Sequence, residues 1–375
     1  MTTGNHFNNN IERPRILICP LDWGLGHATR CIPIIKELIA LNCEVMIAAD
    51  TSTFSLLKKE FPAIVFLRIK GYEMTYSRHK NGLWQKLLVQ IPKIIFKIKQ
   101  EKNWLKKVIA RYKPDAVISD NRFGMYSTKV PSIYITHQLF IKTGNAFTDM
   151  LAQKIHYYFI KKYAQCWVPD FTENELAGEL SHPEKIQSNV IYMGALSRFQ
   201  PIKNIQKIYD LLISISGPEP QRSIFENIIL QQLDHFRGNA LLVRGLPSEP
   251  GTISSSNPSV KIVNHLMAVE FNLALEQSEI VISRSGYTTI MDLVKLNKKA
   301  ILIPTPGQTE QEYLAKYLLQ KKIFYSTKQE KFSLKEALEK SSSFPYTNPH
   351  ISCDDYKNVI NEFVGSLKTG NFVPQ

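Results

Sequence analysis

The chain has 375 residues, of which 44% are hydrophobic and 21% are charged, a globular composition whose length suits two domains. No apolar run reaches the roughly 18–20 residues that a membrane span requires, so we expect no membrane-crossing segment. The polar N-terminus lacks the hydrophobic core of a secretion signal, and the five cysteines form no C-x-x-C pair. These features predict a cytoplasmic protein with reduced thiols and no metal site.

Strands alternate with helices along the chain, which predicts parallel, doubly wound α/β sheets. The first half has expected strands at 15–20, 44–49, 64–67, 115–119, 132–136, 165–168 and 189–193. The second half has them at 211–216, 240–243, 260–263, 279–282, 299–303 and 323–325. We therefore expect a polar tail at 1–14, a first domain at 15–197, a linker at 198–210, and a second domain at 211–375 that includes the C-terminal helices.

Much of the net charge of +13 falls in one segment of the first half. Between Leu83 and Lys113 nine basic residues accompany a single acid, Glu101, and apolar residues recur at three- and four-residue spacing. This pattern predicts an amphipathic helix, bent near Pro92. Two interpretations stay open: the helix attaches to an anionic membrane face, or it packs its apolar side on its own sheet. Nucleic acid is not an expected partner, because no known binding motif is present.

The stretch Val281–Ala315 is the most informative part of the sequence. Ser285-Gly286 lies between a buried strand and a helix, so Gly286 lets the backbone approach a ligand at the positive end of that helix. Phosphate is the usual anion at such a position. Asp292 on the same helix and Glu310-Gln311 beyond the next strand flank one crevice, where open α/β sheets bind nucleotides.

Two further glycine turns follow strands. Gly24-Leu25-Gly26-His27 is half of a dinucleotide fingerprint without its third glycine, and it places His27 at the carboxyl end of the first strand. Ser216-Gly217-Pro218-Glu219 follows the first strand of the second half.

Together these motifs, over about residues 15–325, resemble glycosyltransferase family 28. That family includes the MurG-type N-acetylglucosaminyltransferase that forms lipid II and the plant diacylglycerol galactosyltransferases. The resemblance implies a GT-B fold, in which two Rossmann-like domains face each other across a cleft. It also implies an inverting transfer of a hexose or N-acetylhexosamine from a UDP-sugar, without cofactor or metal, to an acceptor that the basic helix could meet at the inner face of the cytoplasmic membrane.

The resemblance also implies roles for particular residues. Ser285 and Gly286 approach the donor diphosphate, Thr289 contacts the donor, and Asp292 binds the ribose where lipid-II enzymes have glutamate. Glu310 and Gln311 take the place of a Gln-Gln pair on the donor sugar. The other donor-binding candidates are Ser216, Gly217, Arg222 and Arg244, and the acceptor-binding candidates are Gly24, Gly26, His137 and Gln138.

Inverting transfer requires a base for the acceptor hydroxyl and stabilisation of the departing diphosphate. His27 is the first choice for the base, with Asp120, directly after a strand, as its substitute. Helix N-termini and arginine can stabilise the leaving group without a metal ion. Two alternatives stay open: a non-catalytic subunit that binds a nucleotide sugar, and a nucleotide-sugar epimerase of the same fold.

Overall fold

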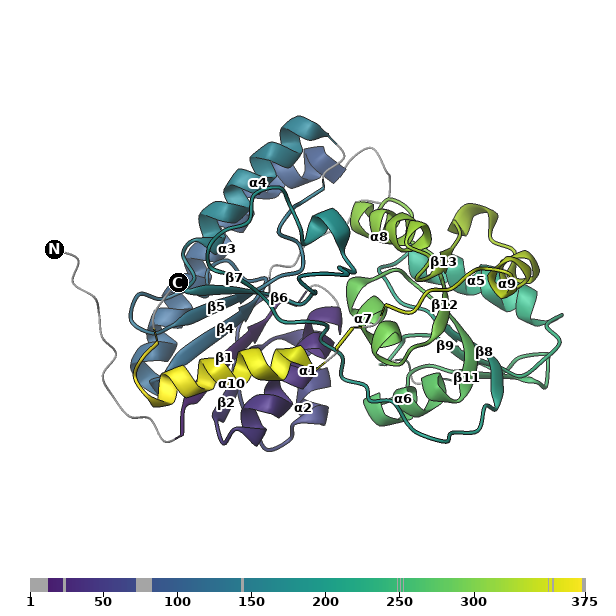
Figure 1. Cartoon of the computed structure of the whole chain (residues 1–375), viewed down its shortest axis with the longest axis horizontal. Helices are drawn as coiled ribbons and strands as arrows, with labels where there is room; N and C mark the ends of the chain where they lie inside the picture. Colours follow the sequence, from purple (N-terminus) through teal and green to yellow (C-terminus); the bar gives the residue numbers. More distant parts are fainter. Residues whose placement is uncertain are drawn as a thin grey trace. The chain divides into compact units, whose positions relative to one another are not determined.

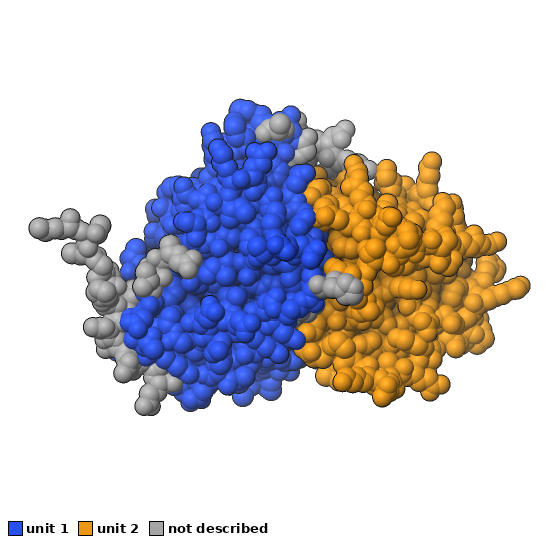
Figure 2. Space-filling view, in the orientation of Figure 1, with its two compact units in different colours: residues 1–75, 82–196, 351–375 blue, residues 76–81, 197–350 orange. Residues whose placement is uncertain are grey.

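The computed structural model describes residues 13–372 except 23–24, 72–82, 143–144, 248, 250, 252, 350 and 353. The chain forms two compact units (Figure 2), and each is built around its own parallel sheet (Figure 1). The second unit begins at Ser197, and the chain returns to the first unit at Ile351. None of the helices in the described part of the chain is long and apolar enough to span a membrane.

The first unit contains a seven-stranded parallel sheet in the order β3-β2-β1-β4-β5-β6-β7. The strands are β1 Arg15–Pro20, β2 Glu44–Ala49, β3 Val65–Arg68, β4 Ala116–Asp120, β5 Ser132–Ile135, β6 Gln165–Val168 and β7 Val190–Tyr192. The helices between them are α1 Leu25–Ala40, α2 Thr51–Glu60, α3 Leu83–Tyr112 and α4 Ala146–Ile160, with a short 3₁₀ turn at Gly178–Leu180. The central strand β4 is buried along its whole length, including its two polar residues at the carboxyl end, Ser119 and Asp120.

The second unit contains a six-stranded parallel sheet in the order β10-β9-β8-β11-β12-β13. Its strands are β8 Tyr209–Ser214, β9 Ala240–Val243, β10 Val260–Val263, β11 Ser278–Ser283, β12 Lys299–Leu302 and β13 Tyr325–Ser326. Its helices are α5 Gln221–Leu233, α6 Ala268–Glu276, α7 Tyr287–Lys295, α8 Thr309–Gln320 and α9 Leu334–Ser342, with a 3₁₀ turn at Gln329–Lys331. The loops after β8, β11 and β12 meet at one sheet edge, because these strands are neighbours and parallel.

The last helix, α10 (Asp355–Lys368), corrects the expected domain boundaries. It packs against α1 of the first unit (Figure 1). The Phe363 ring meets Trp167 of β6 edge-on at 5.3 Å, and Lys368 Nζ donates to the Leu41 carbonyl at 3.2 Å. Residues 351–372 therefore do not belong to the second unit. The periodicity of an amphipathic helix shows that one face is buried, but not on which sheet it is buried.

The segment expected to be a linker, 198–210, packs as part of the second unit. Phe199 is buried and meets Phe271 edge-on at 5.7 Å, and Lys207 Nζ donates to the Glu276 carbonyl. The last two residues of the expected linker already belong to β8.

The basic helix α3 continues through Pro92, and its side chains are described from Lys93 onward. The second half of α3 packs its apolar side on the sheet of the first unit, which is one of the two interpretations that the sequence left open. Leu105 and Val108 are buried against β1, β2 and β4, and Glu101 accepts a hydrogen bond from Arg122 Nη1 at 2.8 Å. Ile95 and Phe96, in the first half, are 60% and 59% exposed. The sheet therefore accounts for only part of the apolar face of α3.

Candidate active site

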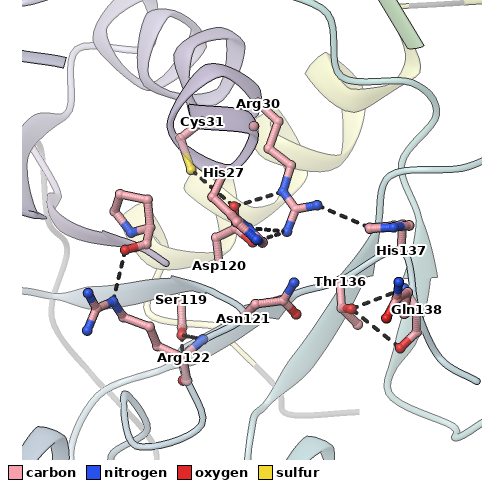
Figure 3. A network of polar contacts seen from close by, with 12 residues as sticks. His27, Arg30, Cys31, Ser119, Asp120, Asn121, Arg122, Thr136, His137 and Gln138 are labelled. Carbon is pink, nitrogen blue, oxygen red and sulfur yellow. Dashed lines mark hydrogen bonds and ion pairs between the residues drawn. The ribbon is translucent and has the colours of Figure 1, made fainter. Parts of the chain in front are cut away.

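Three predicted residues meet at the carboxyl edge of the first sheet. Pro20 and Asp120, the last residues of β1 and β4, are register partners, and Asp120 pairs in turn with Ile135 at the end of β5. This register brings together Asp120, the first turn of α1 with His27, and the loop after β5 with His137 (Figure 3).

Asp120 is fully buried and lies at the centre of this network. Arg30 Nε donates to Oδ2 at 2.8 Å and Arg30 Nη2 donates to Oδ1, while Cys31 Sγ lies 3.7 Å from Oδ2 (Figure 3). Burial would raise the pKa of Asp120, but Arg30 and His27 outweigh that effect and hold the pKa well below its usual range. Asp120 is therefore a carboxylate at neutral pH, and so strongly paired an anion is a poor general base.

His27 has the properties of a neutral base. Its side chain is 15% exposed, and Nδ1 lies 3.1 Å from Asp120 Oδ1 and 2.9 Å from Arg30 Nη2. Burial lowers the pKa of His27, and the Arg30 charge adds to this against the opposing effect of Asp120. In the tautomer whose Nδ1–H donates to Asp120, Arg30 Nη2 donates to Asp120 Oδ1 and not to the ring, and the lone pair of Nε2 is available to accept a proton.

Arg30 was not predicted as a site residue. It follows His27 by three residues, so both side chains lie on the same side of α1, and its Nη1 reaches His137 Nδ1 at 3.1 Å. Its position three residues after His27, at helical spacing, was the available sequence signal.

The other predicted acceptor residues lie near this network. The Gly26 carbonyl accepts from Thr29 Oγ1 at 3.0 Å, His137 is buried, and the Gln138 amide donates to Thr136 Oγ1 at 3.1 Å. Gly24 lies outside the described residues.

In the second unit, Ser285 and Gln311 connect two of the predicted donor loops. Ser285 Oγ donates to the Gln311 carbonyl at 2.8 Å, and Gln311 Oε1 accepts from the Thr305 amide at 2.9 Å. Gln311 therefore braces the loop after β12 in this structure. Thr289 and Glu310 are half-buried, on the first turns of α7 and α8.

Arg222 and Arg244 share a carboxylate that is not among the predicted site residues. Glu226 is 4% exposed and accepts from Arg222 Nη1 at 3.0 Å and from Arg244 Nε. Arg222 Nε also donates to Glu219 Oε1 at 2.6 Å, in the loop that contains Ser216 and Gly217. The i,i+4 spacing of Arg222 and Glu226 was the signal for this pair.

Asp292 is buried and hydrogen-bonded to the segment that precedes β8. Ser197 Oγ donates to Asp292 Oδ1 at 2.5 Å. Burial raises the pKa of Asp292 to about 6, although Arg198 and the Ser197 hydrogen bond oppose the shift.

The Asp292→Asn variant should make the free energy of unfolding less dependent on pH. A carboxyl whose pKa is raised in the folded state binds its proton more tightly there, so the parent loses stability as the pH rises from about 4 through about 6. A shift of this size corresponds to at most about 3 kcal/mol. Asparagine keeps an acceptor for the Ser197 hydroxyl but does not titrate. Urea unfolding at several pH values should therefore show that the free energy of unfolding of the variant increases relative to that of the parent as the pH rises. A difference that does not change with pH would contradict the assignment.

No group of three or more His, Cys, Asp or Glu suited to a metal ion occurs among the residues that the structure describes. Two parallel α/β units, one with a His–Asp pair and one with a glycine turn at a helix N-terminus, have the architecture of a GT-B glycosyltransferase. The model of the glycosyltransferase family 28 C-terminal domain matches residues 248–353, and the glycosyl transferase family 1 model matches residues 15–173. The chain is a family-28-like glycosyltransferase.

A curated relative is also named a glycosyltransferase, and solved structures share the fold of the chain. An uncharacterized glycosyltransferase of Methanosarcina acetivorans is 23% identical over 322 residues, which are 80% of this chain and 81% of the relative. The glycosyltransferase of kitacinnamycin has the same fold, with a TM-score of 0.63 at 13% identity, and 96% of each chain is covered. Acinetobacter baumannii MurG gives 0.53 at 11% identity over 96% of each chain. S. aureus MnaA in complex with UDP gives 0.60 at 12% identity, covering 95% of this chain and 97% of that one.

Proposed function

We propose that this glycosyltransferase moves a hexose or N-acetylhexosamine from a UDP-sugar to an acceptor hydroxyl, with inversion and without a metal ion. The observation that carries the proposal is the network of His27, Asp120 and Arg30, which provides a neutral base held by a buried carboxylate. Inverting transfer requires such a base to remove the acceptor proton.

In this mechanism Nε2 of His27 takes the proton of the acceptor hydroxyl while the oxygen attacks the anomeric carbon. The bond from that carbon to the diphosphate oxygen breaks, and UDP leaves with the electron pair. Asp120 stabilises the imidazolium that forms, since its pKa stays low and it remains an anion. The amides at the start of α7 are suited to the negative charge of the leaving diphosphate.

Support for a uridine nucleotide comes from the second unit. Its GT-B neighbour MnaA was solved with UDP, and the family 28 model covers the loops after β11 and β12. Asp292 lies one and a half turns into α7. In the proposed complex its carboxylate accepts a hydrogen bond from a ribose hydroxyl in place of the one from Ser197. The sugar is assigned only by class, because Glu310 replaces the first glutamine of the family pair.

An acceptor at a membrane surface would explain the exposed apolar residues of the first unit. Besides Ile95 and Phe96 of α3, five large apolar residues of α4 are between 44% and 69% exposed: Phe147, Met150, Leu151, Ile155 and Tyr158. Exposed lysines accompany them on both helices, including Lys93 and Lys154. Apolar side chains beside lysines are suited to the interface of an anionic bilayer.

Reversing the charge of Lys93 and Lys97 should weaken binding to anionic vesicles. Each lysine near such a surface contributes about 1 kcal/mol, and glutamate adds repulsion, so the double Lys→Glu variant should bind at least about thirtyfold more weakly than the parent. Co-sedimentation with vesicles of phosphatidylglycerol and phosphatidylcholine measures this, and binding should fade as salt is added. Lys331→Glu with Lys335→Glu, the same spacing on the second unit, is the matched control. Equal sedimentation of both double variants and the parent would rule out this docking surface.

The proposed reaction is tested by its product. The protein is incubated in EDTA with radiolabelled UDP-hexoses and a total lipid extract, and the released UDP and the labelled product are identified. Transfer requires UDP and a labelled acceptor in equal amounts. An epimerase would leave the label in a nucleotide sugar of changed configuration, and a non-catalytic subunit would bind the donor without turnover.

A further inference from the structure

Arg284 and Thr305 are two buried residues of the second unit with incomplete polar contacts among the described residues, and both are 1% exposed. The guanidinium of Arg284 has no carboxylate partner, and the hydroxyl of Thr305 has no hydrogen-bond partner. Arg284 follows β11 and Thr305 follows β12, so both lie at the sheet edge where the donor loops meet.

In the part of the chain that the structure describes, the guanidinium of Arg284 contacts backbone carbonyl groups and an aromatic ring, but no carboxylate. Nη2 donates to the Gln221 carbonyl at 2.9 Å, and Nη1 lies 3.3 Å and 3.4 Å from the carbonyls of Ile303 and Pro304. The guanidinium stacks over Phe225 at 4.4 Å, and Nε is buried without a hydrogen-bond partner. Burial lowers the pKa of Arg284 to about 10, so the group stays charged at neutral pH. A buried cation without an anion is costly.

Thr305 directly follows Ile303 and Pro304, whose carbonyls lie close to Arg284 Nη1. Its amide donates to Gln311 Oε1 at 2.9 Å, but Oγ1 is buried with no partner. A Cβ placed on Gly217 would stand 3.5 Å from this hydroxyl, so the loop after β8 lies beside it. Gly217 has a φ of +109°, a backbone conformation that is strained for residues with a side chain. Glycine at this position therefore allows the close approach.

The start of α7 adds further donors beside Arg284. Gly286 is the N-cap residue, and a Cβ placed there would meet nothing within 4 Å, so the space in front of this turn is open. A buried cation, an unused hydroxyl and the first amides of a helix all favour an anion. Their positions on three adjacent loops suit an anion as extended as a diphosphate.

We propose that Arg284 and Thr305 complete the diphosphate site of the donor. Thr305 is a binding residue whose hydroxyl donates to a phosphate oxygen. Arg284 is a positioning residue: it holds the loops after β8 and β12 in place and supplies the positive potential that favours the leaving diphosphate. The assignment rests on the proposed function only in taking the anion to be the diphosphate of a UDP-sugar.

The test compares UDP with uridine, which lacks the phosphates. Affinities of both are measured by calorimetry or NMR titration for the parent and for the Arg284→Met, Arg284→Lys and Thr305→Val variants. Arg284→Met should weaken UDP about tenfold and uridine less than twofold, whereas Arg284→Lys should keep most of the preference because it keeps the charge. Thr305→Val should weaken UDP about fivefold without lowering the melting temperature, because it removes an unpartnered hydroxyl. Thr347→Val, an exposed site on the same unit, is the control.

The outcomes separate this inference from the proposed function. A parent that binds UDP no better than uridine contradicts the donor assignment itself. A parent that prefers UDP, with the same preference in Arg284→Met and Thr305→Val, overturns the roles of these two residues and leaves the donor assignment standing. If Arg284→Met does not fold, Thr305→Val alone decides: an unchanged preference for UDP overturns the proposal.

Discussion

Replacing His27 by alanine is expected to lower the rate of sugar transfer by about 10²–10⁴-fold while the affinity for UDP stays unchanged. General-base catalysis contributes a factor of this size, and His27 lies on the first unit, whereas the proposed donor residues lie on the second. UDP release in the presence of lipid acceptor measures the rate, and calorimetric titration with UDP measures the affinity.

His235→Ala is the matched control, since His235 is exposed on the second unit and outside the proposed site. Parent-like transfer by His27→Ala would exclude His27 as the base. A loss of UDP affinity equal to the loss of rate would instead place His27 in donor binding.

Asp120→Asn is expected to affect both stability and activity. The substitution leaves the buried Arg30 guanidinium without its carboxylate, and breaking a buried ion pair costs about 3–5 kcal/mol. Asparagine can also donate to Nδ1 of His27, which favours the tautomer whose Nε2 carries the proton and cannot act as a base. Urea unfolding should show the loss of stability, and transfer should fall at least as far as in His27→Ala.

Glu44→Gln provides the control for Asp120→Asn. Glu44 pairs with Arg15 at 2.9 Å, but both side chains are more than a third exposed, so this pair should contribute less than about 1 kcal/mol. A variant Asp120→Asn as stable as Glu44→Gln would mean that the buried network is not anchored by Asp120.

The sequence predicts the edge of the sheet on which the site lies, but not how its charges are paired. His27, Asp120 and His137 each follow a buried strand, and parallel strands bring such positions together. Arg30 lies inside a helix, and whether its side chain turns toward Asp120 or toward solvent depends on the packing of α1 on the sheet. The sequence therefore left His27 and Asp120 as alternative bases, and the structure joins them as partners.

The donor residues illustrate a similar limit. Ser285, Gly286 and Arg222 were predicted from glycine turns, helix starts and the family resemblance, and all three lie beside the loops of the second sheet. Glu226 and Thr305 were missed, because their roles arise from contacts between residues at least 18 positions apart in the sequence. Helix α10 was misplaced for the same reason, since long-range packing leaves no local pattern.

The central claim is that this chain transfers a sugar from UDP to an acceptor hydroxyl. The most direct test follows the label of radiolabelled UDP-hexoses, incubated with a lipid extract and either the parent or His27→Ala. We predict that the parent releases UDP and an equal amount of labelled glycolipid with inverted anomeric configuration, and that His27→Ala forms almost none. Label that stays in nucleotide form, or that reaches the acceptor equally with His27→Ala, would contradict this account.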